Sequence, residues 1–320
     1  MQATAEAHPN IAVVKYWGKR DTRLNLPAVP SLSVTLDRYR TRTTVTWGSD
    51  AAEDTLVLNG APTPGRAVEK VSRFLDLVGG ADRPRCRVES ENNFPTAAGL
   101  ASSSSAFSAL ALAATAAAGQ QRSLSALSAL ARQGSGSASR SLWGGWVRWH
   151  MGEAEDGSDS HGDPVAPQEH WDVRVVVAMV GTGPKKVGST TGMQDTARTC
   201  PYYDRWVETA PADVQEGLRA VRARDLERLG RVMEWSTLKM HATMMTSEPS
   251  IRYWKPETIA AMQVVEELRA GGTGAWYTMD AGPNVKVLCA AADAPAVQAA
   301  LQTVVSRVDT LGVGGDARLC

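Results

Sequence analysis

The order of strand-like runs and helical segments is the feature of this sequence that most limits its fold. Runs rich in β-branched residues come first, as IAVVKYW, SLSVTLD, TRTTVTW and TLVLNG, and Gly, Pro or Asn residues separate them. Apolar residues at helical spacing follow, at about 64–78, at about 103–118 and in LSALSALARQ. Because the strands are grouped before the helices and do not alternate with them, the sequence predicts an α+β fold.

The second half of the chain repeats this grouping after a buried strand-like run, VRVVVAMV. Helices are expected at about 213–223, 225–237 and 256–270, then strands near AWYTMD and VKVLCA, and a last helix at about 294–308. The chain has 320 residues, which is long enough for two domains. We therefore expect one domain over residues 1–182 and a second over residues 183–320.

Charge and cysteine usage argue against several classes of protein. The chain has 34 Lys plus Arg and 34 Asp plus Glu, so it lacks the basic excess that binding to nucleic acid requires. Its 4 cysteines form no C-x-x-C pair, which indicates neither a zinc site nor a disulfide framework. Its first twenty residues do not show the basic run followed by an apolar run that is typical of a secretory leader, and it has no run of about 18 apolar residues. We expect a cytoplasmic protein with neither a nucleic-acid nor a membrane partner.

Four consecutive serines, Ser102–Ser105, stand between a Gly-Leu pair and an Ala-rich helical segment in PTAAGLASSSSAFSALAL. One serine is enough to cap a helix. Additional hydroxyls can donate to phosphate oxygens or coordinate Mg²⁺, and a helix N-terminus itself favours an anion. The alternative is a capped helix whose other serines face solvent, and this segment alone leaves both interpretations open.

Three other segments carry residues suited to an anionic ligand. GSGSASRSLWGG places small residues at an expected helix start, with Arg140 as a bidentate partner for a carboxylate or phosphate. DAGPN puts Asp280 at a strand end before a glycine turn, and HPNIAVVKYWGKRD brings Lys15 and Lys19 together. Each segment has a structural alternative: a linker with a surface arginine, an Asx turn, or lysines at a sheet edge. The occurrence of all four segments in one chain favours a site.

The segments NIAVVKYWGKRD, SENNFPTAAGLASSSSA, GSGSASRSLWGG and MDAGPN, in this order, resemble the mevalonate diphosphate decarboxylase branch of the GHMP kinase superfamily. PTAAGLASS corresponds to the phosphate loop of the superfamily, P-x-x-x-G-L-x-S-S. KYWGKRD and the Ser-Gly-Ser-x-x-Arg element correspond to the decarboxylase branch. Weaker similarity continues through KKVGSTTGM and KMHATMMTSEPSIRYW, so the resemblance covers most of the chain.

The resemblance implies a fold and a reaction. The implied fold is the GHMP kinase fold, with a ribosomal-protein-S5-like N-terminal domain, a ferredoxin-like α/β sandwich as C-terminal domain and an active-site cleft between them. The implied reaction uses ATP and Mg²⁺. It phosphorylates the tertiary hydroxyl of mevalonate 5-diphosphate and then releases phosphate and carbon dioxide to give isopentenyl diphosphate. A homodimer is also implied.

The resemblance also implies roles for individual residues of this sequence. Asp280 is implied as the acid group that accepts the proton of the tertiary hydroxyl or orients it. Arg140 would grip the substrate carboxylate and keep Asp280 ionised, and Lys15 would lie near the transferred phosphoryl group. The implied substrate-binding residues are Tyr16, Lys19, Ser135, Gly136, Ser137, Arg140, Ser189, Thr190 and Asn10. The implied nucleotide-binding residues are Pro95, Ala98, Gly99, Leu100, Ala101, Ser102, Ser103 and Ser104, with Ser103 also expected near Mg²⁺.

One departure from the family pattern leaves the substrate open. Some relatives carry an arginine at the position of Thr190, and a threonine cannot pair bidentately with a phosphate. Mevalonate 5-phosphate or another 3-hydroxy acid therefore stays possible as a substrate. A kinase that stops at the phosphorylated product and a nucleotide-binding protein without turnover are further alternatives. Trp143, Trp146, Trp149 and His241 are expected to serve packing rather than chemistry.

Overall fold

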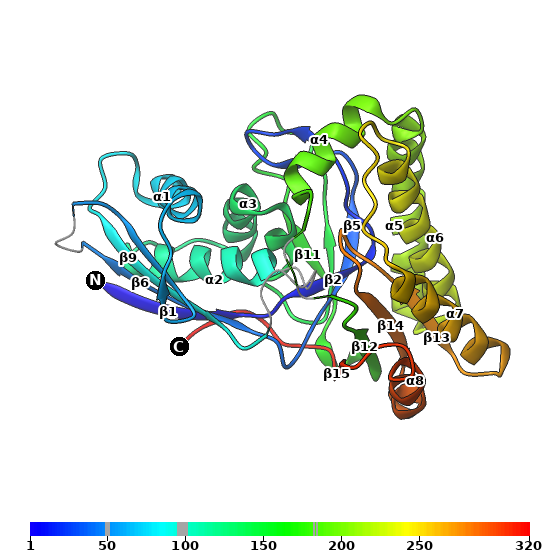
Figure 1. Ribbon diagram of the computed structural model, residues 1–320. Helices are drawn as coiled ribbons and strands as arrows, with labels where there is room; N and C mark the ends of the chain where they lie inside the picture. Colours follow the sequence, from blue (N-terminus) through cyan, green and yellow to red (C-terminus); the bar gives the residue numbers. More distant parts are fainter. Residues whose placement is uncertain (49–51, 95–101, 182, 184) are drawn as a thin grey trace.

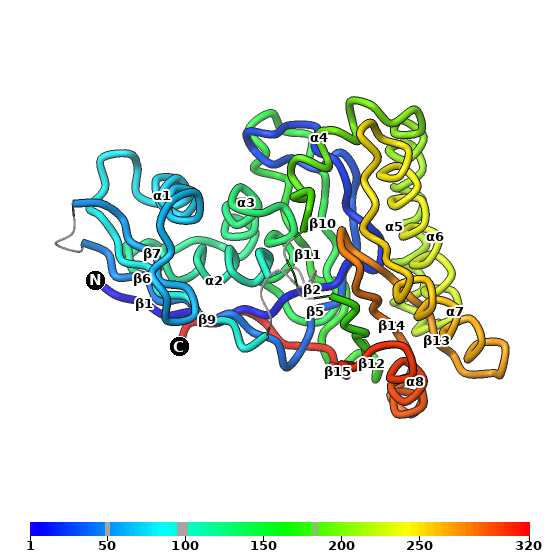
Figure 2. Tube along the Cα trace, viewed as in Figure 1, coloured from blue at the N-terminus to red at the C-terminus, as the bar shows by residue number. Residues whose placement is uncertain are grey.

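The computed structural model describes residues 1–48, 52–94, 102–181, 183 and 185–320. Within them, the strands form three larger sheets and a two-stranded ribbon (Figure 1). The first sheet lies at one end of an elongated molecule and the third at the other, with the second between them. Both chain termini lie beside the first sheet, and Figure 2 shows the red C-terminal segment returning to the blue N-terminal strand.

The first sheet packs against two helices, and a third helix packs on those two. Its strands, in spatial order, are β16 (Arg318–Leu319), β1 (Gln2–Ala7), β6 (Thr41–Trp47), β9 (Cys86–Asn92), β7 (Thr55–Leu58) and β8 (Ala61–Pro62). The helices are α1 (Arg66–Gly79), α2 (Ser102–Ala117) and α3 (Leu124–Gly134). Val45, Phe74 and Phe107 belong to the core between them. This packing fixes the position of the first turn of α2 and of the residues that follow α3. Two of the expected ligand-binding segments lie there.

The second and third sheets share a core with the long helices. The second sheet has the order β11 (Gly162–Ala166), β10 (Trp146–Trp149), β5 (Ser31–Thr35) and β2 (Asn10–Val14). The third has the order β13 (Ala275–Thr278), β14 (Val285–Ala290), β12 (Val173–Ala178) and β15 (Val308–Leu311). The apolar cluster around Leu32, Trp146 and Val175 joins the two sheets, so the ends of β2 and β13 are held in fixed relation.

The remaining elements complete the chain. They are the ribbon β3 (Lys19–Asp21) and β4 (Leu26–Pro27), the helices α4 (Ser189–Thr199), α5 (Tyr203–Ala223), α6 (Leu226–Met245), α7 (Pro256–Ala270) and α8 (Ala294–Leu301), and the 3₁₀ turns η1 (Gly136–Arg140), η2 (Gln168–His170) and η3 (Ala291–Asp293). Arg224, in the left-handed region at φ 56°, ends α5, and the Asp225 side chain caps α6 by accepting from the backbone N–H of Arg228 at 2.9 Å.

Several details differ from the sequence-based expectations. The structure has α5 starting ten residues before the expected 213 because the helix continues through Pro211, although proline removes one backbone hydrogen bond. The last helix ends at Leu301, and residues 308–311 pair with β12 instead. Strand β12 also pairs with β14, so the expected boundary at residue 182 follows a strand of the third sheet. The division into two domains at that residue stays a prediction.

Helix α4 is an element that the sequence pattern did not indicate. Its sequence, STTGMQDTART, contains glycine and several threonines, which are weak helix formers. The helix is stabilised by packing: a Cβ on Gly192 would lie 3.2 Å from the Trp17 ring, and Met193 is buried in the same cluster. The helix therefore depends on a tertiary contact, which places its first turn beside the residues after β2.

Candidate active site

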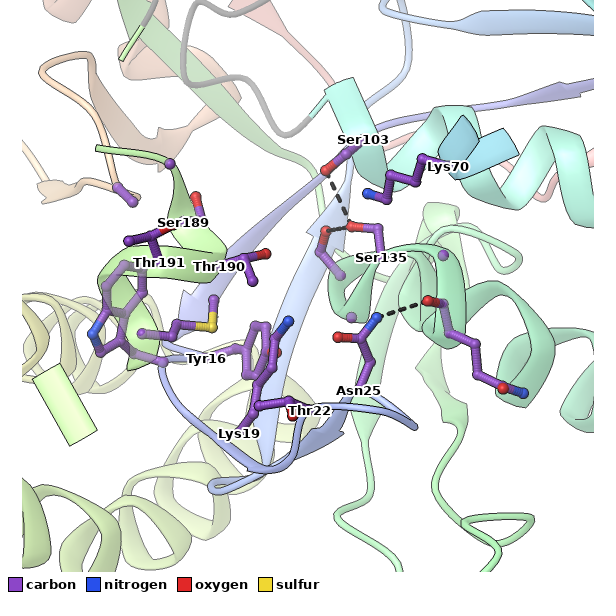
Figure 3. Close-up of a pocket in the computed structure, with 18 of the residues that line it drawn as sticks. Tyr16, Lys19, Thr22, Asn25, Lys70, Ser103, Ser135, Ser189, Thr190 and Thr191 are labelled. Carbon is purple, nitrogen blue, oxygen red and sulfur yellow. Dashed lines mark hydrogen bonds between the residues drawn. The ribbon is translucent and has the colours of Figure 1, made fainter. Parts of the chain in front are cut away.

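A cavity of about 860 Å³ lies among α1, α3, α4 and the segments that follow β2 and β13. Figure 3 shows Ser189, Thr190 and Thr191 on one side of it and Ser103, Ser135 and Lys70 on the other. The expected site residues that line it are Lys15, Tyr16, Lys19, Ser103, Ser135, Gly136, Ser137, Ser189, Thr190 and Asp280. The fold thus brings together residues from all four segments that the sequence analysis selected.

Asp280 is held by two lysines at the cavity wall. Lys15 Nζ donates to Asp280 Oδ1 at 2.9 Å, and Lys286 Nζ donates to Asp280 Oδ2 at 3.0 Å. Although desolvation raises the pKa of Asp280, the two ammonium groups outweigh it and hold that pKa well below its usual range. The carboxylate is therefore ionised. These lysines are the cations hydrogen bonded to it. Arg140, which the resemblance implied as a cation that keeps Asp280 ionised, also interacts with it through charge.

For Lys15, unlike Asp280, the effect of burial on the pKa outweighs the attraction of the opposite charge. Lys15 follows the end of β2, lines the cavity, and also donates to the carbonyl oxygen of Ala12 at 2.8 Å. Burial lowers the pKa of Lys15 to about 8, with the nearby Lys286 and Arg140 acting in the same direction and Asp280 acting against them. An anion that approaches Lys15 would stabilise its charged form.

Arg140 and Asn10 lie behind the cavity and not on its surface. Arg140 Nε and Nη2 each donate to Asn10 Oδ1 at 3.2 Å, and Nη1 donates to Ser31 Oγ at 2.6 Å. Its guanidinium lies 5.6 Å from the Trp149 ring centroid, and no carboxylate among the described residues pairs with it. Burial lowers its pKa to about 10. The structure therefore shows Asn10 as a partner of Arg140, and Arg140 as a buried cation in need of an anion.

The serine-rich segments divide between the cavity and the protein interior. Ser103 lines the cavity and accepts a hydrogen bond from Ser135 Oγ at 3.1 Å, as Figure 3 shows. Ser104 and Ser105 are buried, and Ser105 Oγ is 2.6 Å from Thr41 Oγ1. The expected nucleotide contacts Pro95, Ala98, Gly99, Leu100 and Ala101 lie outside the described residues. The serines thus serve both packing and cavity, and Ser102 and Ser104 do not line it.

The chain after α3 presents small residues close to an aromatic hydroxyl. Ser135 connects α3 to η1, and a Cβ on Gly136 would lie 2.8 Å from Tyr16 Oη. Tyr16 Oη itself is buried and lacks a hydrogen-bond partner among the described residues. Because an unpaired buried hydroxyl is costly, this group is suited to donate to a ligand in the cavity.

Four cations that line the cavity and one lysine next to it were not expected from the sequence. Arg23, Lys70, Arg73 and Lys185 line the cavity, and Lys286 binds Asp280 from β14. Lys70 and Arg73 are three residues apart on α1, a spacing that places both on one helix face and was the available signal. Together with Lys15 and Lys19, the described lining residues include six cations against the single carboxylate of Asp280.

This balance of charge suits a multiply phosphorylated ligand. Over the residues that the structure describes, no group of three or more His, Cys, Asp or Glu side chains could hold a metal ion. Hard cations such as Mg²⁺ prefer oxygen ligands, and Ser103, the residue expected near Mg²⁺, lines the cavity with its hydroxyl-bearing side chain.

His241 and the tryptophans occupy the packing positions that were expected. Trp143, Trp146 and Trp149 are buried, as is His241 on α6. Burial lowers the pKa of His241 to about 3, so the imidazole is neutral, and it is hydrogen bonded to the backbone of Met279. His241 Nε2 has no partner among the described atoms. The histidine lies beside the Lys15–Asp280 pair without lining the cavity.

These features define an enzyme site for small phosphorylated substrates. Residues 7–162 match the Diphosphomevalonate decarboxylase-like N-terminal domain, and residues 175–313 match the Mevalonate 5-diphosphate decarboxylase C-terminal domain. A diphosphomevalonate decarboxylase of Gibberella zeae is 40% identical over 334 aligned residues, which cover 98% of this chain and 86% of that protein. The chain belongs to the diphosphomevalonate decarboxylase family.

Solved structures agree with this assignment. Mevalonate diphosphate decarboxylase from Staphylococcus aureus superimposes with a TM-score of 0.94 at 37% identity, covering 100% of this chain and 98% of that one. The complex of MDDEF with MVAPP, AMPPCP and magnesium gives a TM-score of 0.94 at 38% identity, covering 100% and 99%. The expected α+β, GHMP kinase fold is confirmed. Across the described part of the chain, no helix is both long and apolar enough to cross a membrane.

Proposed function

We propose that the chain catalyses the ATP-dependent decarboxylation of mevalonate 5-diphosphate, which gives isopentenyl diphosphate, ADP, phosphate and carbon dioxide. The observation that carries the proposal is the carboxylate of Asp280, held between two ammonium groups at the wall of a cavity with six cations. Those cations would neutralise the phosphates of the substrate and of ATP. The similarity to diphosphomevalonate decarboxylases supports the same reaction.

The reaction joins a phosphoryl transfer to a fragmentation. The tertiary hydroxyl oxygen takes the γ-phosphoryl group and its proton is released to solvent, while ADP leaves with the electron pair of the broken P–O bond. The C–O bond to the new phosphate then breaks with its electron pair on the phosphate. The C–C bond to the carboxylate also breaks, its electron pair forms the double bond, and carbon dioxide leaves. Positive charge develops on the carbinol carbon, so fixed charge and positioning supply most of the catalysis.

Three residues are proposed to act on the reacting groups. Asp280 would accept a hydrogen bond from the tertiary hydroxyl and stabilise the positive charge that develops beside it. Because the pKa of Asp280 lies well below its usual range, orienting the hydroxyl fits this carboxylate better than removing the proton. Lys15 would meet the transferred phosphoryl group. Arg140 lies behind the cavity wall, so the substrate carboxylate would have to reach past the cavity-lining residues to supply the anion that Arg140 lacks.

The remaining contacts concern the phosphates. The substrate diphosphate is proposed to lie against Tyr16, Lys19 and residues 135–137, with Ser189 and Thr190 opposite. The nucleotide phosphates are proposed to lie along residues 95–104, on the side of the cavity that Lys70 and Ser103 both line (Figure 3). A Mg²⁺ ion held by Ser103 and phosphate oxygens would neutralise charge on the transferred group.

The experiment that tests the function offers the purified protein Mg²⁺, ATP and one of mevalonate, its 5-phosphate or its 5-diphosphate, with ADP and carbon dioxide measured in the same samples. The expected result is equal amounts of both products from the diphosphate alone. ADP without carbon dioxide would identify a 3-kinase instead. Activity on the monophosphate would direct attention to Thr190, and absence of both products would contradict the proposal.

The pH dependence of the free enzyme follows from Lys15. Burial lowers its pKa to about 8, and the reaction needs its charged form. Since the charge is lost as pH rises through this value, kcat/KM for the diphosphate is expected to fall roughly tenfold per pH unit above about 8. Initial rates at low substrate concentration between about pH 6 and about pH 10 would measure this. A flat profile over that range would remove Lys15 as the essential cation.

Replacing Lys70 by methionine should weaken nucleotide binding. The substitution removes a cation that lines the cavity near Ser103, and one charge-assisted contact to phosphate is worth about 1.5–3 kcal/mol, so the Kd for ATP should rise by about tenfold or more. Titration calorimetry would measure it. Arg66→Met is the matched control, because Arg66 is exposed on the same helix and does not line the cavity. An equal effect of both substitutions would indicate a general charge effect.

The assembly and location of the protein are also proposals. We infer that the protein forms a homodimer, because the resemblance to the family implies one. We also infer that it is cytoplasmic, because its cysteines are reduced. Cys86, Cys200 and Cys289 are buried free thiols, which suits a reducing compartment. Sedimentation equilibrium of the purified protein would test the dimer, and a concentration-independent monomer mass would contradict it.

A further inference from the structure

The two lysines at Asp280 differ in position and in rigidity. Lys15 lines the cavity and belongs to the segment between β2 and β3. Lys286 is fully buried, does not line the cavity, and lies on β14, where its backbone is in register with Val177 of β12 and Thr278 of β13. One carboxylate oxygen of Asp280 therefore binds a lysine that an incoming ligand can reach. The other binds a lysine fixed on an inner strand of the third sheet.

This difference matters when a phosphoryl group arrives. An anion in the cavity competes with Asp280 for the ammonium group of Lys15, because both attract the same charge. If Lys15 were the only cation hydrogen bonded to Asp280, the carboxylate would then lose the partner on Oδ1 in an enclosed site, where desolvation favours the protonated form. A protonated Asp280 could no longer stabilise positive charge on the carbinol carbon.

We propose that Lys286 is a positioning residue for the decarboxylation: its ammonium group holds Oδ2 of Asp280 from behind the cavity, so that the carboxylate stays oriented and ionised while Lys15 turns to the phosphoryl group. The proposal rests on the proposed function. It gives the two lysines separate tasks, one toward the substrate and one toward the carboxylate. Lys286 acts through Asp280 and does not touch the substrate.

The charges around this pair determine what removal of Lys286 would do. Asp280 interacts with Lys15 from the segment after β2, Lys286 from β14, Lys185 from the segment before α4, Arg140 from η1 and the neutral His241 from α6. Lys286 lowers the pKa of Lys15. Removing its charge should therefore raise the pKa of Lys15, since one repulsive neighbour is lost, and should also raise the pKa of Asp280.

The test compares kcat and the alkaline side of the kcat/KM profile in the wild-type protein, Lys286→Met and Lys286→Arg. Methionine keeps the length of the side chain and removes the charge. The expected result is a kcat lower by roughly 10- to 100-fold, as for displaced reacting groups, with the alkaline fall of kcat/KM moved to higher pH. Lys286→Arg keeps a cation, so its alkaline fall should stay near that of the wild type, and its kcat should exceed that of Lys286→Met.

A matched control separates this effect from the loss of any buried ion pair. Lys239→Met breaks the ion pair between Lys239 Nζ and Asp213 Oδ2, which are 2.5 Å apart. This pair lies outside the cavity. The substitution should leave the alkaline fall unchanged. Two results with folded Lys286→Met would overturn the inference. One is a fall of kcat/KM at the same pH as in the wild type or at a lower pH, and the other is a kcat close to that of the wild type. If Lys286→Met does not fold, Lys286→Arg with a kcat no better than that of Asp280→Asn would overturn it. Failure of the wild-type protein to release carbon dioxide would instead refute the proposed function.

Discussion

Replacing Asp280 by asparagine is expected to lower kcat by at least about 10³-fold while the Kd for ATP stays within a few-fold of the wild-type value. The amide keeps the shape of the side chain but carries no negative charge, so it cannot stabilise the positive charge on the carbinol carbon. It also leaves the ammonium groups of Lys15 and Lys286 without the carboxylate that each contacts. Single-turnover measurement of ADP and carbon dioxide, with ATP binding measured by calorimetry, would give both quantities.

Asp213→Asn is the matched control for this substitution. Asp213 is also a mostly buried aspartate paired with a lysine, Lys239, but it lies on α5 and does not line the cavity. Both variants should lose some thermal stability, because each leaves a lysine without its carboxylate. Only Asp280→Asn should lose turnover. Near-normal turnover in Asp280→Asn would remove Asp280 from the mechanism.

The sequence predicts the fold where local pattern and tertiary structure agree. The β-branched runs became β2, β5, β6 and β7, and their grouping before the helices indicated the α+β class that the structure has. Helix α4 was missed because its threonines and Gly192 disfavour a helix locally, and tertiary contacts such as that with Trp17 stabilise it. That contact joins residues far apart in the chain, so no local pattern could reveal it. The first turn of α4 nevertheless supplies three residues of the cavity wall.

The candidate site could be predicted only in part for a similar reason. Asp280 and Lys15 stood out because each lies next to a strand end, where side chains face a cleft. Lys286 stood within VKVLCA, where one lysine in an alternating strand normally faces solvent. Its burial is possible because Asp280 supplies a carboxylate within hydrogen-bond distance. Lys70 and Arg73 looked like the solvated face of an ordinary helix until the packing of α1 placed them at the cavity.

Replacing Arg140 by lysine is expected to lower kcat by about 10²-fold or more, although the positive charge is kept. Arg140 uses three nitrogens at once, since Nε and Nη2 bind Asn10 Oδ1 and Nη1 binds Ser31 Oγ. The shorter ammonium of lysine cannot span these partners and present a planar, bidentate face to the substrate carboxylate. Steady-state assays of carbon dioxide release at saturating ATP and substrate would measure the loss.

Arg132→Lys separates this catalytic effect from damage to the fold. Arg132 is equally buried and, like Arg140, does not line the cavity, but its guanidinium donates to the carbonyl oxygens of Leu24, Gly157 and Ser160. The charge of Asp280 acts on Arg140 and is not among the charges that act on Arg132. Lysine there should lower the Tm, because buried carbonyl oxygens lose their donors, and should leave kcat within a few-fold of wild type. If Arg140→Lys had the same profile, a lower Tm with normal turnover, Arg140 would be a structural cation. A lower kcat without a matching loss of Tm would place its guanidinium at the reacting carboxylate.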